Sequence, residues 1–425
     1  MNIIILGGGL AGCTVAYLLR NKGFETTIID RNPYVGGLCQ THTINGINYE
    51  FGPHVLYADR DSEVQNFFQH FFPNFEETKY FPRLSVDGDI DKLGFFPPTA
   101  ENIFLFTKEE QIKAIEELYQ INLTNPNTEN LEQFIKSRVG SIIYDKNFKN
   151  YNLKHWGLHP KNMSAEWAKF RNFYLRPAGY GMFGNAWQGH PGSYQDFFNQ
   201  LTQGTEIIQA NINNIIENNG NIKKIITDRG EFAGDYYIST IPLDQLITNN
   251  CTLEYRGVAK LFFLLEGKSK MPTYLTTFPN NYSFTRIVDY TLQSNQKKNN
   301  SLMSFAFPYS SLTNTKLPLD SWKKEAVSFI ASKNLGRILE YKCVMENNCY
   351  PVSSPNMLLN YNTLIGKISN IGNMITLGRL GLYAYISMCT IVKQALEVSE
   401  NFENILIMNY DEKIELYKKL RENLK

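Results

Sequence analysis

The sequence predicts an α/β protein that combines a discontinuous Rossmann-like domain with a small helical domain and a domain built on an antiparallel sheet. Residues 2–6 form a short apolar run followed by glycines and a helical pattern, and a second strand, turn and helix pattern returns at residues 374–396. Residues 100–165 have helical periodicity, whereas residues 246–367 contain the apolar runs of a sheet. Two distant βα units in one sheet indicate that the first domain is assembled from separated parts of the chain.

The first strand leads directly into a glycine-rich turn. Gly7, Gly9 and Gly12 give the pattern GxGxxG. Glycine there permits a tight turn, close approach of the backbone to a pyrophosphate and packing of the helix on its strand, while the anion lies at the positive helix end. The next strand, residues 25–29, ends at Asp30, whose carboxylate can accept a hydrogen bond from a ribose hydroxyl. Because strand, helix and acidic strand end frame the glycines, we interpret them as a dinucleotide site.

The residues that follow favour FAD over NAD. Gly36–Gly37 opens a second turn, and residues 47–52 then run back as a strand. This pair, followed by a polar run, resembles the extended FAD-binding signature of flavoproteins with two dinucleotide-binding domains, a group that includes the amine oxidases. Late in the chain, Gly378–Arg379 forms a turn before a helix expected over residues 385–396. The N-terminus of that helix can face the flavin or its phosphates.

We expect four parts: an FAD-binding domain, a helical domain with a mobile substrate loop, a substrate-binding sheet domain and a C-terminal helix. The FAD-binding domain comprises residues 1–80, 195–245 and 368–398, and the helical domain comprises residues 100–165. The sheet domain comprises residues 81–99, 166–194 and 246–367, and the C-terminal helix comprises residues 399–425. The charged final stretch is expected to be a solvated tail or a partner surface. Turn residues predict hairpins at Asp87–Gly88, over residues 84–90, and at Asn218–Asn219–Gly220.

Composition and charge argue against several classes of protein. The 425 residues include 42 basic and 41 acidic side chains, and this balance gives no general attraction to nucleic acid or to a membrane surface. No apolar run approaches the length of a membrane span. The 6 cysteines lack CxxC spacing and are expected to be reduced thiols of a cytoplasmic protein. No group of cysteines and histidines has metal-ligand spacing, so we expect no metal.

Residues 148–198 are rich in large aromatic side chains, glycines and cations, among them Trp156, Trp187 and Arg171. Aromatic faces can stack on a base or a sugar, and arginine can bind phosphate through two hydrogen bonds. The stretch is therefore either part of a ligand site or a domain joint filled with bulky residues. Composition alone leaves both interpretations open.

Several separated motifs resemble those of the UDP-galactopyranose mutase family, and they occur in the family's order across most of the chain. These are GGGLAG, FGPHVLY with His54, HWGLHP with Trp156, MFGNAWQGHPGSY, LEYRG with Arg256, SFTRIVDY with Arg286, CYPV with Tyr350, and GRLGLYAYISM with Arg379, Tyr383 and Tyr385. The GPH segment together with the distant GRLG segment is the most specific part of the resemblance.

The resemblance implies a role for each matching residue. His54 lies beside the isoalloxazine, and Arg171 and Arg286 clamp a diphosphate; these three are the expected catalytic residues. Arg256, Gly378 and Arg379 join the glycines and Asp30 on the cofactor side. Expected substrate-binding residues are Trp156, Trp187, Tyr350, Tyr383 and Tyr385.

The implied activity is the interconversion of pyranose and furanose forms of a nucleotide-diphosphate sugar for surface polysaccharide synthesis. N5 of reduced FAD is the nucleophile at the anomeric carbon, and NADPH or NADH is the expected reductant. A homodimer is expected, without nucleic acid or membrane insertion. Because the cofactor supplies the nucleophile, the reaction requires no Ser-His-Asp triad, and none is evident.

The chain departs from the family pattern at positions on the sugar and phosphate side. Met182 precedes Phe183 where the family has tyrosine, Ser387 stands in place of an aspartate, Tyr57 in place of a histidine, and Arg171 falls one residue late. The substrate could therefore carry a deoxyhexose, an amino sugar or a heptose. Two alternatives are an FAD-dependent oxidoreductase of the amine or protoporphyrinogen oxidase type, and a nucleotide-sugar-binding or partner-binding protein without turnover.

Overall fold

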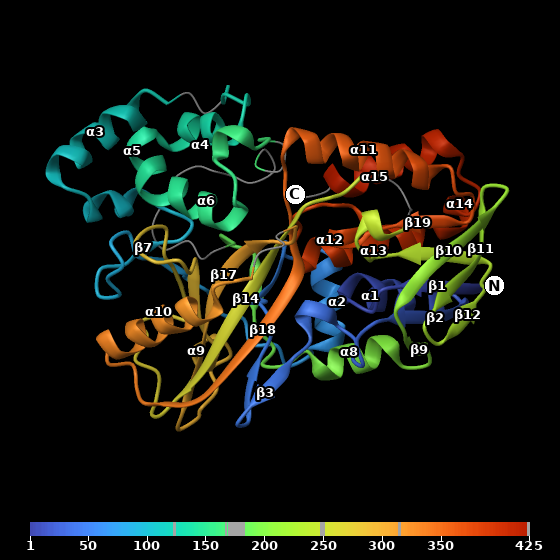
Figure 1. Ribbon diagram of the computed structural model, residues 1–425, viewed down its shortest axis with the longest axis horizontal. Helices are drawn as coiled ribbons and strands as arrows, with labels where there is room; N and C mark the ends of the chain where they lie inside the picture. The colour runs from blue at the N-terminus through green and yellow to red at the C-terminus, as the bar shows by residue number, and fades with distance from the viewer. Residues whose placement is uncertain (122–124, 166–167, 169–182, 247–250, 313–315, 423–425) are drawn as a thin grey trace.

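The computed structural model describes the chain except residues 122–124, 166–167, 169–182, 247–250, 313–315 and 423–425. Figure 1 shows a parallel sheet with helices on one side of the molecule, a long antiparallel sheet on the other, and a group of helices beside the antiparallel sheet. Among the described residues, no helix has the length and apolarity that a bilayer span requires.

The parallel sheet confirms the predicted discontinuous Rossmann-like domain. Its five strands follow the order β19-β13-β1-β2-β9. The strands are β1 (Asn2–Leu6), β2 (Glu25–Asp30), β9 (Glu206–Gln209), β13 (Tyr236–Ser239) and β19 (Met374–Thr376). In register, Ile4 lies between Thr27 of β2 and Tyr237 of β13. Their apolar, β-branched sequences suit strands that are covered on both faces.

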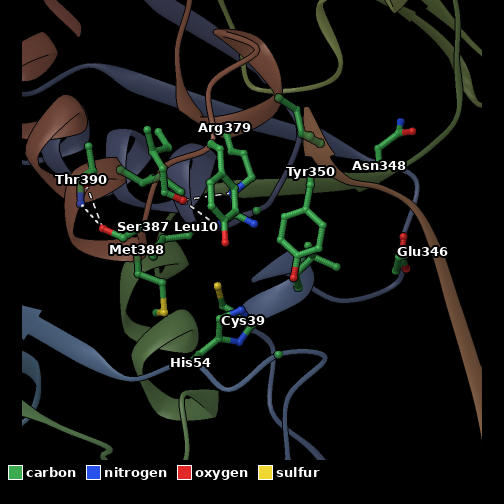
Figure 2. Close-up of a pocket in the computed structure, with 18 of the residues that line it drawn as sticks. Leu10, Cys39, His54, Glu346, Asn348, Tyr350, Arg379, Ser387, Met388 and Thr390 are labelled. Carbon is green, nitrogen blue, oxygen red and sulfur yellow. Dashed lines mark hydrogen bonds between the residues drawn. The ribbon is translucent and has the colours of Figure 1, made fainter. Parts of the chain in front are cut away.

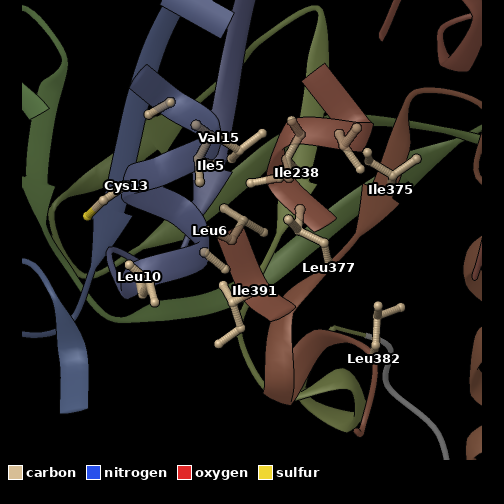
Figure 3. Packing of buried hydrophobic residues seen from close by; sticks show 14 of the residues in the cluster. Ile5, Leu6, Leu10, Cys13, Val15, Ile238, Ile375, Leu377, Leu382 and Ile391 are labelled. Atoms are coloured by element: carbon tan, nitrogen blue, oxygen red, sulfur yellow. The ribbon is translucent and has the colours of Figure 1, made fainter. Parts of the chain in front are cut away.

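Helices from both ends of the chain pack on this sheet. In Figure 3, Val15 of α1 (Leu10–Arg20) and Ile391 of α13 (Met388–Glu400) lie in one cluster with side chains of the parallel strands. The other elements of this region are α2 (Glu63–Phe71), α8 (Gln195–Thr202), α11 (Pro355–Ser369), α12 (Gly378–Gly381), η1 (Gly37–Cys39) and η5 (Leu243–Gln245). The late helix begins at Met388, three residues after the predicted start, because Tyr383 adopts a φ of 47° and Ser387 caps the helix.

A three-stranded antiparallel sheet covers part of the same core. Its strands are β10 (Ile212–Asn218), β11 (Asn221–Thr227) and β12 (Gly230–Phe232). The predicted turn between β10 and β11 is confirmed, with φ values of 53° at Asn219 and 71° at Gly220. Asparagine and glycine tolerate this left-handed conformation, which matches the twist of a hairpin.

The second large sheet has seven strands in the order β18-β14-β17-β16-β15-β6-β7. They are β6 (Arg83–Leu84), β7 (Gly94–Phe95), β14 (Tyr255–Leu265), β15 (Leu275–Thr277), β16 (Arg286–Asp289), β17 (Ser301–Ser310) and β18 (Ile338–Pro351). All pairs are antiparallel except β6 with β15. The expected hairpin over residues 84–90 was wrong: β6 pairs instead with β7, which begins at Gly94. Helices α9 (Tyr290–Gln293) and α10 (Leu319–Ser332) flank this sheet.

The helical region lies beside the antiparallel sheet (Figure 1). It contains η2 (Ala100–Leu105), α3 (Lys108–Tyr119), α4 (Leu131–Val139), α5 (Ser141–Ile143), the π-helical η3 (Tyr144–Lys149), α6 (Asn150–Trp156) and η4 (Pro160–Asn162). A capping box between Thr107 and Glu110 fixes the start of helix α3.

The final stretch is not a solvated tail. Helices α14 (Phe402–Ile405) and α15 (Tyr410–Glu422) pack against the parallel-sheet core, with Leu416, Tyr417 and Leu420 buried. The ammonium group of Lys413 donates to the carbonyl oxygens of residues 371, 372 and 374. Because these apolar residues alternate with charged ones, the sequence does not reveal the buried face of the helix.

The structure also contains two small antiparallel sheets of two strands each. In one, β3 (His42–Ile44) pairs with β4 (Ile47–Tyr49), and in the other, β5 (Leu56–Ala58) pairs with β8 (Trp187–Gly189).

Candidate active site

One cavity of about 940 Å³ connects the parallel sheet, the antiparallel sheet and the helical region. Its wall includes the glycine turn at the end of β1, the segment around His54, helix α6, strand β16 and the start of α13. Figure 2 shows part of this wall, with side chains from several of these elements directed into the space. A cavity at the carboxyl ends of parallel strands is where nucleotide cofactors bind in open α/β sheets.

The glycine turn leaves one end of the cavity open to a ligand. Gly9 caps α1 and lines the cavity, and a Cβ atom built there would meet no atom within 4 Å. At Gly12 a Cβ atom would lie only 1.9 Å from the carbonyl oxygen of Gly7. Gly12 therefore permits close packing of helix and strand, as expected, whereas Gly9 exposes the positive end of α1 to the cavity.

Asp30 holds this turn in place. Its Oδ2 accepts a hydrogen bond from the backbone N–H of Gly8 at 2.6 Å, and its Oδ1 accepts one from Asn32 at 2.7 Å. The second turn lies against the first, since the N–H of Gly36 donates to the Gly8 carbonyl at 2.7 Å. Gly36 and Gly37 have φ values of 99° and 55°, which glycine adopts without strain.

His54 lies in the middle of the cavity wall, near Cys39 and Arg379 (Figure 2). Burial lowers the pKa of its imidazole well below 6.5, and the positive charge of Arg379 acts in the same direction. His54 is therefore neutral at pH 7. Cys39 does not supply a thiolate there, because burial raises the pKa of its thiol to about 12.

Arg379 is fixed by backbone carbonyl groups. Its Nε and one terminal nitrogen donate to the carbonyl oxygen of Ile386 at 3.1 and 2.6 Å, and the other terminal nitrogen donates to that of Cys349 at 3.3 Å. The nearby Ser387 is the N-cap of α13, since its hydroxyl accepts a hydrogen bond from the N–H of Thr390 at 3.2 Å. Serine fulfils this capping role as an aspartate would, without the charge.

Arg286 and Tyr350 form the polar part of the opposite wall. A terminal nitrogen of Arg286 donates to the hydroxyl of Tyr350 at 2.5 Å, and its Nε is buried without a partner among the described residues. Burial opposes the charge on Arg286, but the phenol oxygens of Tyr350 and Tyr151 raise the pKa of the guanidinium above its usual value. Arg286 is thus a fixed cation with hydrogen-bonding capacity left for a ligand.

Aromatic rings surround this cation. The ring of Tyr350 lies 5.3 Å from that of Tyr385 and 4.6 Å from that of His155, measured between centroids. Trp156 is almost completely buried, and its ring meets Tyr385 edge-to-face at 5.5 Å. These aromatic groups shield the wall from bulk water, which strengthens electrostatic interactions inside the cavity.

Several predicted residues lie outside the cavity lining. Arg256 donates through Nε to the carbonyl oxygen of His155 at 3.0 Å. The hydroxyl of Tyr383 lies within hydrogen-bond distance of two backbone carbonyl oxygens. The ring of Trp187 packs on Phe75 at 4.3 Å. These side chains support the wall from behind, as does Gly378, where an added Cβ atom would lie 2.8 Å from that of Ala11. Arg171 and Met182 lie outside the described residues.

Sequence reasoning missed other cavity residues. Tyr151, Asn152 and His155 all reach the cavity from α6. The first and last are one helical turn apart, with parallel rings at 5.5 Å, and this spacing was the available signal. Thr240 lines the cavity from the end of β13, where only the sheet topology places it next to the glycine turn. No group of three or more potential metal ligands occurs in the part of the chain that the structure describes.

Comparison with known proteins covers almost the whole chain. A model of the UDP-galactopyranose mutase family matches residues 146–329, and one of an NAD(P)-binding Rossmann-like domain matches residues 5–71. A Klebsiella pneumoniae protein described as "Probable UDP-galactopyranose mutase" is 23% identical over 424 residues, which cover 94% of each chain. The chain is thus similar to the UDP-galactopyranose mutases, at low identity. Together, the two matches support an enzyme with a dinucleotide-binding domain.

Further similar proteins place the chain in a broad fold group. A dTDP-fucopyranose mutase of Escherichia coli is 27% identical over 168 residues, which cover 38% of this chain and 44% of the relative. A crystal structure of reduced UDP-galactopyranose mutase has a TM-score of 0.79 at 16% identity and covers 100% of this chain and 99% of its own. A putrescine oxidase bound to putrescine has a TM-score of 0.60 at 13% identity, and the match covers 95% of this chain and 99% of the oxidase. At these identities the solved structures establish the fold.

The cavity fits FAD. The open surface at Gly9, the carboxylate of Asp30 and the second glycine turn can hold the pyrophosphate and ribose. The start of α13 and His54 line the same cavity and would be available to the isoalloxazine. The residues present therefore match the cofactor that the resemblance implies.

Proposed function

We propose that this enzyme interconverts the pyranose and furanose forms of a nucleotide-diphosphate sugar, working with reduced FAD. The observation that carries the proposal is that one cavity contains both the dinucleotide turn and a separate wall with Arg286, Tyr350 and Tyr385. Relatives described as UDP-galactopyranose and dTDP-fucopyranose mutases support it, since both names denote this type of reaction.

Reduced FAD supplies a nucleophilic N5 for the anomeric carbon of the sugar. The chain's own residues bind and orient the substrate. Arg286 is a fixed cation that can hold the diphosphate, which gains negative charge as it leaves. The Tyr350 hydroxyl, already hydrogen-bonded to Arg286, can donate to the same group.

The remaining cavity residues exclude water and orient the ring. Trp156 and Tyr385 supply flat apolar faces for the sugar or the base. His54 is neutral at pH 7, so one ring nitrogen can donate a hydrogen bond to a ligand and the other can accept one. We assign it to the side of the flavin, where it can hydrogen-bond the cofactor or a sugar hydroxyl.

The identity of the sugar is part of the proposal. Ser387 carries no charge where the family pattern has an aspartate, and Tyr57 stacks on Phe183 at 3.6 Å where the pattern has a histidine. These changes make this part of the wall less polar. They support a substrate other than UDP-galactose, such as a deoxyhexose nucleotide. We further propose NADPH or NADH as reductant, a homodimer, and a role in surface polysaccharide synthesis.

The proposal is tested with purified FAD-loaded protein. The flavin is reduced with dithionite, the protein is incubated with a panel of UDP-, GDP- and dTDP-sugars, and the nucleotide sugars are separated by chromatography. A new isomeric peak that forms only with reduced protein is the expected result. Lack of conversion across the panel would overturn the proposal. Bleaching of the oxidised flavin by substrate alone would instead identify an oxidoreductase.

A further inference from the structure

A buried polar network lies beside the segment that carries His54, and the proposed chemistry does not use it. It consists of Thr41, Glu50, His190 and Tyr194, here called the His54 clamp. The side chains of Glu50 and His190 are only 1% and 2% exposed, and Tyr194 is fully buried. Burial of this many polar groups is costly unless they are fully hydrogen-bonded, so the network has a defined geometry.

Glu50 and His190 form the first link of the clamp. The N–H of Gly192 donates to Nδ1 of His190 at 3.0 Å, so the ring proton is on Nε2, which donates to Oε2 of Glu50 at 3.2 Å. The other carboxylate oxygen of Glu50 accepts a hydrogen bond from the Thr41 hydroxyl at 2.7 Å. The network therefore fixes one tautomer of His190.

Tyr194 forms the second link. Its hydroxyl donates to the carbonyl oxygen of His54 at 2.8 Å, and its backbone N–H donates to the Thr41 hydroxyl oxygen at 2.8 Å. Residues 50–54 and 190–194 are thus joined by a hydrogen bond at each end, and the Thr41 hydroxyl contacts both Glu50 and Tyr194. The turn that presents His54 is held as a closed unit.

The His54 ring depends on this unit for its position. Its Nδ1 is buried and has no hydrogen-bond partner among the described residues. The ring lines the cavity (Figure 2), while the backbone behind it is attached to the clamp. Because no hydrogen bond to a described residue fixes Nδ1, the position of the imidazole depends on the backbone of residues 50–54.

We propose that the clamp consists of positioning residues that hold His54 at the correct place for the flavin. The inference rests on the proposed function, since it assumes that His54 faces the cofactor. An error of about 1 Å in such a group can cost on the order of 100-fold in rate. The clamp acts through His54 and touches neither cofactor nor substrate.

The test uses a change that removes one hydroxyl. In FAD-loaded protein, Tyr194→Phe keeps the ring but breaks the bond to the His54 carbonyl. Tyr80→Phe is the matched control, because the buried Tyr80 hydroxyl also donates to a backbone carbonyl, that of Gln293, at 3.0 Å, and Tyr80 does not line the cavity. We expect Tyr194→Phe to lower kcat at least about tenfold with KM within about twofold, while Tyr80→Phe changes neither.

Two readouts do not depend on turnover. The visible spectrum of bound FAD should shift in Tyr194→Phe but not in Tyr80→Phe. Hydrogen exchange of the amides of residues 52–55 should become faster only in Tyr194→Phe. If the wild type converts no nucleotide sugar, the proposed function fails, and these two readouts still decide whether the clamp holds His54 against the flavin.

A conservative pair of variants at His190 separates positioning from simple packing. Gln can accept from Gly192 and donate to Glu50, so His190→Gln should keep the spectrum and the rate close to those of the wild type. His190→Leu fills similar space without these bonds and should resemble Tyr194→Phe. Wild-type spectrum, exchange and kcat in folded Tyr194→Phe and His190→Leu would overturn the inference.

Discussion

Replacement of Arg286 by alanine tests the substrate wall most directly. The guanidinium is a fixed cation, and its Nε lacks a partner among the described residues, so a bound diphosphate would form charge-assisted hydrogen bonds with it. Removal of one partner of a desolvated charge pair costs about 2 to 5 kcal/mol. A loss of about 3 kcal/mol corresponds to roughly 100-fold weaker binding.

Calorimetric titration of FAD-loaded Arg286→Ala with UDP and dTDP measures this loss. The flavin-to-protein absorbance ratio should stay at the wild-type value, because the glycine turns and Asp30 belong to the parallel-sheet domain, whereas Arg286 belongs to the antiparallel sheet. Arg83→Ala is the control, since Arg83 belongs to the same sheet but stacks on Phe95 at 4.1 Å and does not line the cavity. Affinity within about threefold of the wild type would remove Arg286 from the diphosphate site and refute the reasoning.

Four further predictions concern the cofactor side. His54→Ala should retain flavin and the wild-type melting temperature but lose most of its turnover; unchanged kcat would assign His54 a structural role. Because the pKa of His54 is lowered below 6.5, the unfolded chain binds its proton first as pH falls. Stability should therefore decrease below about pH 6.5, by at most about 1.4 kcal/mol per pH unit, and urea unfolding of His54→Gln should lack this contribution. Gly12→Ala should purify with little or no flavin, since its Cβ atom would lie 1.9 Å from the Gly7 carbonyl oxygen; a wild-type flavin absorbance would contradict this. Asp30→Asn places an amide N–H₂ against a backbone N–H and should weaken FAD binding about tenfold, as measured by flavin fluorescence on dilution; equal retention in variant and wild type would argue against the role of Asp30.

The cofactor sheet was predictable because its signals are local. Residues 2–6 and 25–30 are apolar β-branched runs, and the glycine pattern between them has one well-known structural meaning. Gly12 is also determined locally, because the atom that excludes a side chain there is the carbonyl oxygen of Gly7, a neighbour in the chain. Composition and spacing near each position therefore contained the information.

Strand β18 and helix α15 were not predictable in this way. β18 lies at the edge of its sheet, and most of its residues from Ile338 to Glu346 are polar or half-exposed, so it lacks the apolar run of a central strand. In α15, Lys413 is buried because three carbonyl oxygens accept its hydrogen bonds, whereas the sequence shows only a charged segment. In both cases the partner groups lie far away in the sequence.

The candidate site shows the same division. The sequence by itself determined the α/β class, the dinucleotide turn and, through its resemblance to a family, the set of residues to examine. Only the tertiary structure placed Arg286, Tyr350 and His54 around one cavity and moved Arg256 and Trp187 behind its wall. The reason is physical: a turn is fixed by contacts between neighbours in the chain, whereas a cavity is formed by residues whose packing brings distant segments together.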